Sequence, residues 1–115
     1  MADNCIFCKI ARGEIPATIV YQDDRVVAFR DINPGAPVHV LIIPREHIAS
    51  AAAIDPSNAA LAGYLLQIAA QIAKQENIVD SGYRVVTNIG ADAGQSVPHM
   101  HFHILGGRQM AWPPG

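Results

Sequence analysis

Short apolar runs and one long helical pattern divide the chain. Five runs rich in β-branched and other apolar residues predict strands over Thr18 to Gln22, Arg25 to Arg30, Val38 to Ile43, Gly82 to Asn88 and His99 to Leu105. Between the third and fourth runs, apolar residues recur at spacings of four, three and four, at Leu61, Leu65, Ile68 and Ile72. This spacing predicts an amphipathic helix that packs one side against an apolar surface.

The residues around these runs indicate where the helices begin and end. Asp55 is expected to cap the long helix, with Pro56 at its first position, where no backbone N–H is needed. A short helix is expected over residues 5–12, closed by Gly13. Since three strands precede the long helix and two follow it, strands and helices do not alternate. This order favours an antiparallel α+β domain.

Length and composition are typical of one domain, residues 1–115. Half of the residues are hydrophobic and 16% are charged, which supports an apolar core and argues against disorder. The formal net charge of −2 offers no basic surface for nucleic acid. No apolar run reaches the length of a membrane span, and Met1-Ala2-Asp3-Asn4 does not resemble a targeting segment. We therefore expect a cytoplasmic protein with no membrane partner.

The segment from residue 99 to residue 105 carries the clearest chemical signal. In a strand, side chains alternate between faces, so Met100 and Phe102 point into a core while His99, His101 and His103 share the opposite face, about 6.6 Å apart. A solvated polar face and a pure metal site are the alternatives to catalysis here. A neutral imidazole can attack phosphorus and leave again, so a covalent phospho-histidine divides one hard step into two. The middle histidine is the natural nucleophile, because its neighbours can orient it.

The loop before this strand suits a phosphate group. Gly90 and Gly94, with small residues between them, allow backbone N–H groups to converge on an anion, and Ser96 adds a hydroxyl donor. The alternative is a simple turn between two strands. No lysine and no GxxxxGK[ST] pattern occur here, which excludes a nucleoside-triphosphate motor or kinase of the P-loop type.

Cys5 and Cys8 have the spacing of half a zinc site. Two buried thiols or a redox pair are the alternatives, although the pair does not follow a strand of a βαβ unit as a redox motif would.

Together these segments resemble the histidine triad (HIT) nucleotide-binding proteins. Residues 99–105 satisfy the His-φ-His-φ-His-φ-φ signature, where φ is apolar, at every position. Residues similar to the family's also occur at 23–25, 29–32, 37–39, 43–44 with His47, and 94–97, and the end of the chain, 106–115, resembles the Hint branch. Two positions depart from the pattern. Pro98 stands where related chains often carry an aromatic residue, and Ala111 replaces a polar residue common before the tail tryptophan.

The resemblance implies a fold and an activity. It implies a five-stranded antiparallel sheet with one long and one short helix, in a homodimer that joins two sheets. It implies binding of purine nucleoside monophosphates and hydrolysis of their phosphoramidates through a nucleotidylated histidine. Dinucleoside polyphosphate hydrolysis is the alternative enzyme class. A zinc-stabilised nucleotide-binding or interaction module with little turnover is the alternative outside catalysis.

The resemblance also assigns residues to these roles. Catalysis falls to His101 as nucleophile, to His103 beside the phosphate, and to Ser96. Nucleotide binding is assigned to Ile6, Phe7, Ile10, Phe29, Asp31, Ile32, Asn88, Gly94, Gln95, Ser96, His101 and His103. Structural zinc would be held by Cys5, Cys8, His47 and His99, and no organic cofactor is implied.

Some of these residues have simpler interpretations. Phe29 and Ile32 could belong to the core, and Asp31 could cap the turn before Asn33. His39 lies in the predicted central strand, where it either supports the triad or is a buried histidine with its own partner.

Overall fold

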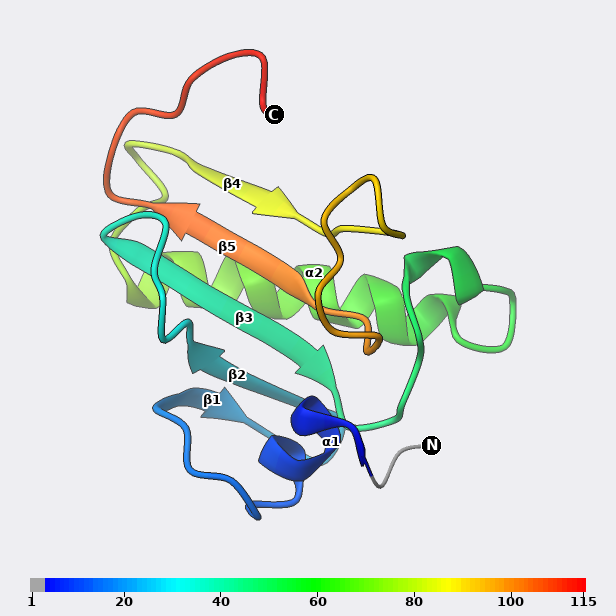
Figure 1. Cartoon of the computed structure of the whole chain (residues 1–115). Coiled ribbons are helices and arrows are strands. Elements are labelled where there is room, and N and C mark those ends of the chain that lie inside the picture. Colours follow the sequence, from blue (N-terminus) through cyan, green and yellow to red (C-terminus); the bar gives the residue numbers. More distant parts are fainter. Residues whose placement is uncertain (1–3) are drawn as a thin grey trace.

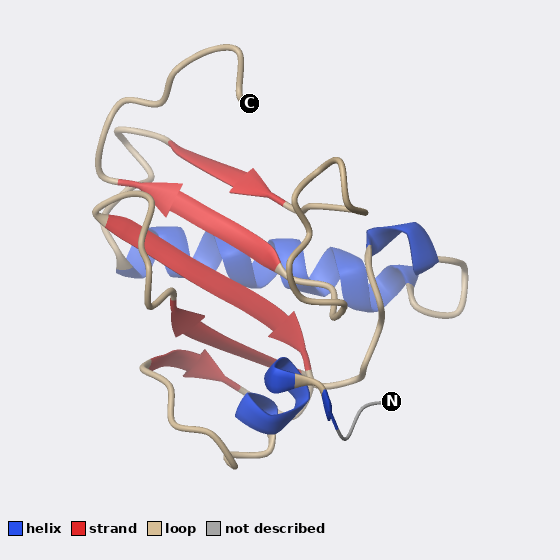
Figure 2. Cartoon of the chain, in the orientation of Figure 1, coloured by secondary structure: helices blue, strands red, loops and turns tan. Residues whose placement is uncertain are grey.

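Five antiparallel strands form one sheet in the computed structural model, which describes residues 4–115. The elements in chain order are α1 (Ile6–Ala11), β1 (Ile19–Gln22), β2 (Val26–Arg30), β3 (Val38–Pro44), the 3-10 turn η2 (Ala51–Ala53), α2 (Ala59–Gln75), β4 (Tyr83–Val86) and β5 (Phe102–Gly106). The strand order is β1-β2-β3-β5-β4, and every neighbouring pair is antiparallel. The predicted α+β fold class is therefore confirmed (Figures 1 and 2).

The two helices cover opposite faces of the sheet. Figure 1 shows α2 running across the back of the sheet, while α1 lies in front near the ends of β2 and β3. One apolar core joins Leu65, Ile68 and Ile72 of α2 to the sheet. A second, smaller core joins Phe7 and Cys8 of α1 to the other face. β3 is therefore buried on both sides, which explains its continuous apolar sequence.

α1 occupies the range expected from the sequence. Its N-cap is Cys5, whose sulfur accepts a hydrogen bond from the Cys8 backbone N–H at 3.4 Å. Arg12 is the C-cap, and Gly13 follows with φ of +77°, a conformation that a residue with a side chain rarely adopts.

Two predicted boundaries are wrong. α2 begins at Ala59 with Asn58 as its N-cap, because Asp55 closes a separate turn by accepting from the Ser57 backbone N–H and hydroxyl. β5 begins at Phe102 rather than at His99, because the preceding residues pair with other partners, as Met100 does with the Ile48 carbonyl. The alternation nevertheless holds, since Met100, Phe102 and Ile104 all lie in the core under α2.

No helix in the described part of the chain combines the length and the hydropathy needed to cross a membrane. Residues 1–3, on which the expectation about a targeting segment partly rests, lie outside the described residues.

Two glycines offer a paired test of this packing. Gly63 lies on the exposed side of α2, and a Cβ there would meet nothing within 4 Å. Gly106 ends β5, and a Cβ there would lie 2.8 Å from Cδ1 of Ile78. We expect Gly63→Ala to raise the free energy of unfolding by about 1 kcal/mol and Gly106→Ala to lower it by about 1–3 kcal/mol. Urea denaturation measures both, and a Gly106→Ala protein as stable as the wild type would contradict this packing.

Candidate functional site

The three histidines of the signature have different surroundings. All three lie on the side of the sheet that faces α1. His99 is fully buried beside Cys5 and Cys8, His101 is 4% exposed under Phe7, and His103 is half-buried beside His39. Sequence alternation thus places them on one face, and tertiary contacts then give each a different role.

The hydrogen bonding of His101 leaves one ring nitrogen available. Its Nδ1 lies 2.8 Å from the His99 backbone carbonyl, which can only accept, so the proton resides on Nδ1. The neutral ring therefore carries its lone pair on Nε2. The ring of Phe7 packs edge-on against His101, with 5.0 Å between the centroids. This contact holds the imidazole in one orientation.

A chain of hydrogen bonds determines where His103 carries its proton. The Gly35 backbone N–H can only donate, and it donates to Nδ1 of His39 at 2.9 Å. His39 therefore carries its proton on Nε2 and donates it to Nδ1 of His103, also at 2.9 Å. His103 then holds its own proton on Nε2. That N–H is buried and has no partner among residues 4–115.

The role of His39 follows from this chain. It orients His103, and the Asp31 carboxylate lies 3.4 Å from the same His39 Nε2 and supports the assigned proton position. Burial, together with the neighbouring His101 and His39, lowers the pKa of His103 to about 4. Burial also lowers the pKa of His39. Both rings are therefore neutral near pH 7, in agreement with the hydrogen bonds.

A cavity of about 350 Å³ opens in front of these histidines, between α1 and β2. It brings together nine of the twelve residues predicted for nucleotide binding, namely Ile6, Phe7, Ile10, Phe29, Asp31, Ile32, Ser96, His101 and His103. Seven further residues line it that the sequence did not indicate, because nothing distinguishes them from ordinary loop and core positions. These are Ile15, Pro16, Ala17, Arg30, Asn33, Leu41 and Val97.

The sequence left three lining residues with a structural alternative: a core position for Phe29 and Ile32, and a turn cap for Asp31. Phe29 is 4% exposed and belongs both to the small core and to the cavity wall. Ile32 is not a core residue, since it is 91% exposed at the cavity rim. Asp31 does cap the turn by accepting from the Asn33 backbone N–H at 2.8 Å, while its other oxygen faces His39.

The remaining three predicted residues lie outside this cavity. Asn88 lines a different hollow on the other side of His103. Gln95 holds its own loop together, because its amide donates to the Ala49 and Val97 carbonyls and accepts from the Gly90 N–H.

The backbone N–H groups of residues 94 and 95 are also used within the loop. They donate to the carbonyls of Ala91 and Gly90, at 3.0 and 3.1 Å. The expectation that these two N–H groups bind phosphate therefore does not hold in this structure. Among the residues predicted to contact phosphate, Ser96 with its hydroxyl and His103 with its Nε2–H line the cavity.

The four residues assigned to zinc lie together. Nδ1 of His99 is 3.3 Å from the Cys5 sulfur and 3.4 Å from the Cys8 sulfur, and Nδ1 of His47 is 3.3 Å from the Cys8 sulfur. All four ligand atoms lie within 4.8 Å of one another, and neither cysteine forms a disulfide. Sulfur and nitrogen ligands of a tetrahedral zinc ion are about 3.5 Å apart. The residues present therefore fit a closed zinc site.

The ring of His99 is already oriented for a metal. Its Nε2–H donates to the Pro44 carbonyl at 2.8 Å, so its Nδ1 is free of a proton and faces both sulfurs. Metal-binding histidines in proteins are held in the same manner, through the nitrogen that does not bind the ion.

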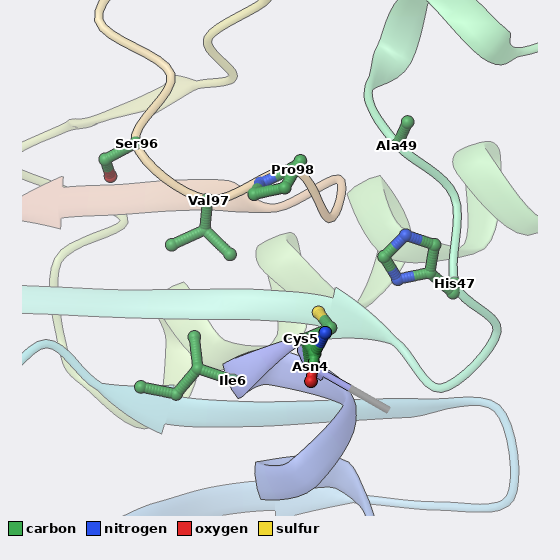
Figure 3. Close-up of a pocket in the computed structure, with 8 residues that line it drawn as sticks. All are labelled: Asn4, Cys5, Ile6, His47, Ala49, Ser96, Val97 and Pro98. Carbon is green, nitrogen blue, oxygen red and sulfur yellow. The ribbon is translucent and has the colours of Figure 1, made fainter. Parts of the chain in front are cut away.

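A second cavity, of about 410 Å³, lies beside the cysteine and histidine cluster and adjoins the cavity in front of the histidines. Figure 3 shows Cys5 and His47 toward one end of it and Ser96 at the other. It is the larger of the two cavities but contains neither His101 nor His103. Ile6, Ser96 and Val97 line both cavities, so the metal cluster and the reactive histidines share one wall.

We expect the low pKa of His103 to make the protein less stable in acid. Its ordinary value of 6.5 falls to about 4 on folding, so between these pH values only the unfolded chain binds the proton. The free energy of unfolding therefore falls as pH drops from 6.5 to about 4. His103→Gln should flatten this part of the curve, as urea denaturation at a series of pH values will show. Parallel curves for the two proteins would count against the assigned protonation.

Comparison with known proteins agrees with this geometry. The HIT domain family matches residues 12–110. An uncharacterized HIT-like protein of Synechocystis is 52% identical over the full length of both chains. A 14 kDa zinc-binding protein of Zea mays is 54% identical over 96% of this chain and 87% of its own. The crystal structure of a HIT family hydrolase from Legionella pneumophila is 51% identical, with a TM-score of 0.96 over 97% of this chain and all of the other. The chain belongs to the HIT domain family.

Proposed function

We propose that this protein hydrolyses purine nucleoside phosphoramidates and releases a nucleoside monophosphate through a nucleotidylated His101. One observation carries the proposal. The Nδ1–H of His101 is held by the His99 carbonyl, which leaves Nε2 as the ring nitrogen without a protein partner, and His101 lines a cavity beside the buried, unpartnered N–H of His103. A nucleophile and a hydrogen-bond donor for a phosphate group thus border the same cavity.

The rest of the cavity suits a nucleoside. Ile6, Phe7 and Ile10 of α1 face Phe29 across an apolar slot that can hold a purine ring. Asp31 lies at the mouth of this slot, and a carboxylate offers acceptors to both hydroxyls of a ribose. This order of apolar slot, carboxylate and histidines matches the order of base, sugar and phosphate.

The reaction takes two displacements at phosphorus. In the first, Nε2 of His101 forms a bond to the α-phosphorus while the P–N bond breaks, and the amine departs with a proton from solvent. In the second, water attacks phosphorus and the P–N bond to His101 breaks. Over both steps one water is consumed, its hydroxyl going to phosphorus and its proton replacing the one taken by the amine. His103 Nε2–H and Ser96 donate to the phosphoryl oxygens as charge develops on them.

The metal cluster is proposed to bind zinc in a structural role. Four protein ligands, Cys5, Cys8, His47 and His99, would close the coordination shell, so zinc supplies cross-linking rather than an activated water. The similar protein of Zea mays is named for zinc binding. Because Cys5 caps α1, Cys8 lies within it and His99 precedes His101, the metal would fix both walls of the nucleotide slot.

We further propose that the protein is a homodimer of the Hint branch type. β1 and β4 are the edges of the sheet and pair with one neighbour each within the described chain. Joining two protomers along such an edge extends the sheet without covering the face that carries the histidines.

We expect purified protein to release amine from an adenosine phosphoramidate. His101→Ala should lower kcat/KM by at least about a thousandfold, because it removes the nucleophile. Mass spectrometry of a rapidly quenched reaction should find the nucleotidyl group on the peptide that contains His101.

Three outcomes would overturn this assignment. If the His101→Ala protein turns over substrate as fast as the wild type, His101 is not the nucleophile. Faster turnover of a dinucleoside polyphosphate would favour the alternative hydrolase class. Tight monophosphate binding without turnover of either substrate would favour a binding module.

We expect zinc to stabilise the folded protein and to support nucleotide binding. At a free zinc concentration 100 times Kd, the free energy of unfolding should rise by about 2.7 kcal/mol. Cys8→Ser should abolish this increase and weaken binding of adenosine monophosphate, because α1 carries one side of the base slot. Thermal denaturation and calorimetry measure the two effects. If zinc leaves the melting temperature of the wild type unchanged, the zinc proposal is wrong.

A further inference from the structure

The segment directly after β3 contacts the short helix α1 at two points. Nδ1 of His47 lies 3.3 Å from the sulfur of Cys8, which is in the first half of the helix. Nη1 of Arg45 donates to the carbonyl of Ala11, the last residue of the helix, at 2.5 Å. The first contact belongs to the metal cluster, whereas the second is a direct hydrogen bond that needs no metal.

The Arg45 guanidinium also joins α1 to the turn between β1 and β2. Its Nε donates to the Asp23 carbonyl at 2.7 Å, and its Nη2 donates to the side-chain oxygen of Gln22 at 3.1 Å. The Arg45 backbone N–H donates to the Arg25 carbonyl at 2.9 Å. A guanidinium holds its donors in a fixed planar arrangement, so one side chain can bond three acceptors at once.

The turn to which this guanidinium attaches the helix is itself well fixed. One carboxylate oxygen of Asp23 accepts from the backbone N–H groups of Arg25 and Val26, at 2.8 and 2.9 Å. The other oxygen accepts from the hydroxyls of Tyr21 in β1 and Tyr64 in α2. The C-terminal end of α1 is therefore connected to a turn that is anchored in the sheet and in the long helix.

α1 depends on bonds to the rest of the protein, because a helix of six residues is too short to be stable alone. Backbone hydrogen bonds such as the one from the Lys9 N–H to the Cys5 carbonyl form the helix but do not attach it to the sheet. The Ala11 carbonyl lies in the last turn, where carbonyls lack partners within a helix and where a positive charge is favourable. Arg45 supplies both a donor and a positive charge at this end.

The end of α1 that Arg45 holds forms part of the base slot. Three apolar residues of the helix line the nucleotide cavity, namely Ile6, Phe7 and Ile10. Ile10 directly precedes Ala11, whose carbonyl accepts from Arg45. The residues proposed to donate to phosphate, Ser96 and His103, come from other segments of the chain. Loss of the bond to Ala11 would therefore loosen the base slot and leave the phosphate site in place.

We propose that Arg45 is a positioning residue that holds the C-terminal end of α1 in the conformation that binds a purine ring. The inference rests on the proposed nucleotide binding in this cavity and extends it to a residue that does not line the cavity. Without the bond, α1 is docked in only a fraction of the molecules, and the observed affinity falls by that fraction. The loss is selective for ligands that carry a base.

The experiment compares adenosine monophosphate with ribose 5-phosphate, which lacks the base. Arg45→Met keeps the length of the side chain but removes its donors and its charge. We expect it to weaken binding of adenosine monophosphate by about tenfold, as when α1 is docked in about one molecule in ten. Ribose 5-phosphate should bind as it does to the wild type, which also shows that the variant is folded. Arg45→Lys should recover part of the loss, because a lysine can still donate to the Ala11 carbonyl. Calorimetry measures each affinity.

Two further measurements separate positioning from a general loss of stability. Amide hydrogen exchange should be faster in α1 of Arg45→Met, while β3 and α2 keep the wild-type rates. With an adenosine phosphoramidate as substrate, KM should rise about tenfold while kcat is retained, because the docked molecules have an intact phosphate site.

Arg25→Met is the matched control. Arg25 is an exposed arginine next to the same turn, and its guanidinium carbon lies 3.8 Å from the centroid of the Tyr64 ring. This contact leads to α2 and away from α1, so the control should bind both ligands and exchange its amides as the wild type does.

Three results would overturn the inference. If Arg45→Met binds adenosine monophosphate as tightly as the wild type, α1 does not need this bond. If the variant loses affinity for both ligands equally, or exchanges faster throughout the chain, Arg45 supports the whole fold and not the base slot. If the wild type binds neither ligand, the nucleotide site and this inference are both wrong. A wild type that binds adenosine monophosphate but cleaves no phosphoramidate refutes the proposed hydrolysis alone, since the effect of Arg45 is measured by binding.

Discussion

The hydrogen bond from Nδ1 of His101 to the His99 carbonyl is the interaction on which the site depends. It joins a ring to the backbone two residues earlier, so it forms only when the chain before β5 takes its observed course. That course depends in turn on His99, whose ring is held between the Pro44 carbonyl and the two cysteine sulfurs. The reactive nitrogen of His101 is therefore available because the neighbouring histidine is anchored to a different part of the protein.

The same anchoring explains why a six-residue helix is part of the site. α1 is too short to be stable alone, but Cys5 caps it, its own residue Cys8 is buried in the small core, and both sulfurs contact His99. The helix thereby presents Phe7 to the edge of His101 and closes the apolar slot. The Cys/His cluster, α1 and His101 are consequently linked, because Cys5 and Cys8 belong to the cap and first turn of α1 and His99 precedes His101 by two residues.

Much of the fold could be predicted because its signals are local. The strand runs, the helical spacing and the glycine that ends α1 depend on neighbouring residues and were located within a few positions. Of the two errors in element boundaries, one has a local cause and the other a tertiary cause. The Asp55 carboxylate accepts hydrogen bonds within a turn and does not cap α2. Residues 99–101 do not join β5, because they pair with partners outside the sheet, as Met100 does with the Ile48 carbonyl.

The sequence by itself determined the chemistry of the face, because the alternation of His99, His101 and His103 with Met100, Phe102 and Ile104 separates the histidines from the core. This separation holds although β5 begins only at Phe102. Tertiary structure decided what each histidine does. The bond between His39 and His103 joins residues 64 positions apart, and the bond from Arg108 to Gly35 spans 73 positions. No pattern of spacing encodes such contacts, since they arise only when β3 and β5 pair and the tail folds over them. The positions of the protons on these histidines are therefore properties of the folded chain alone.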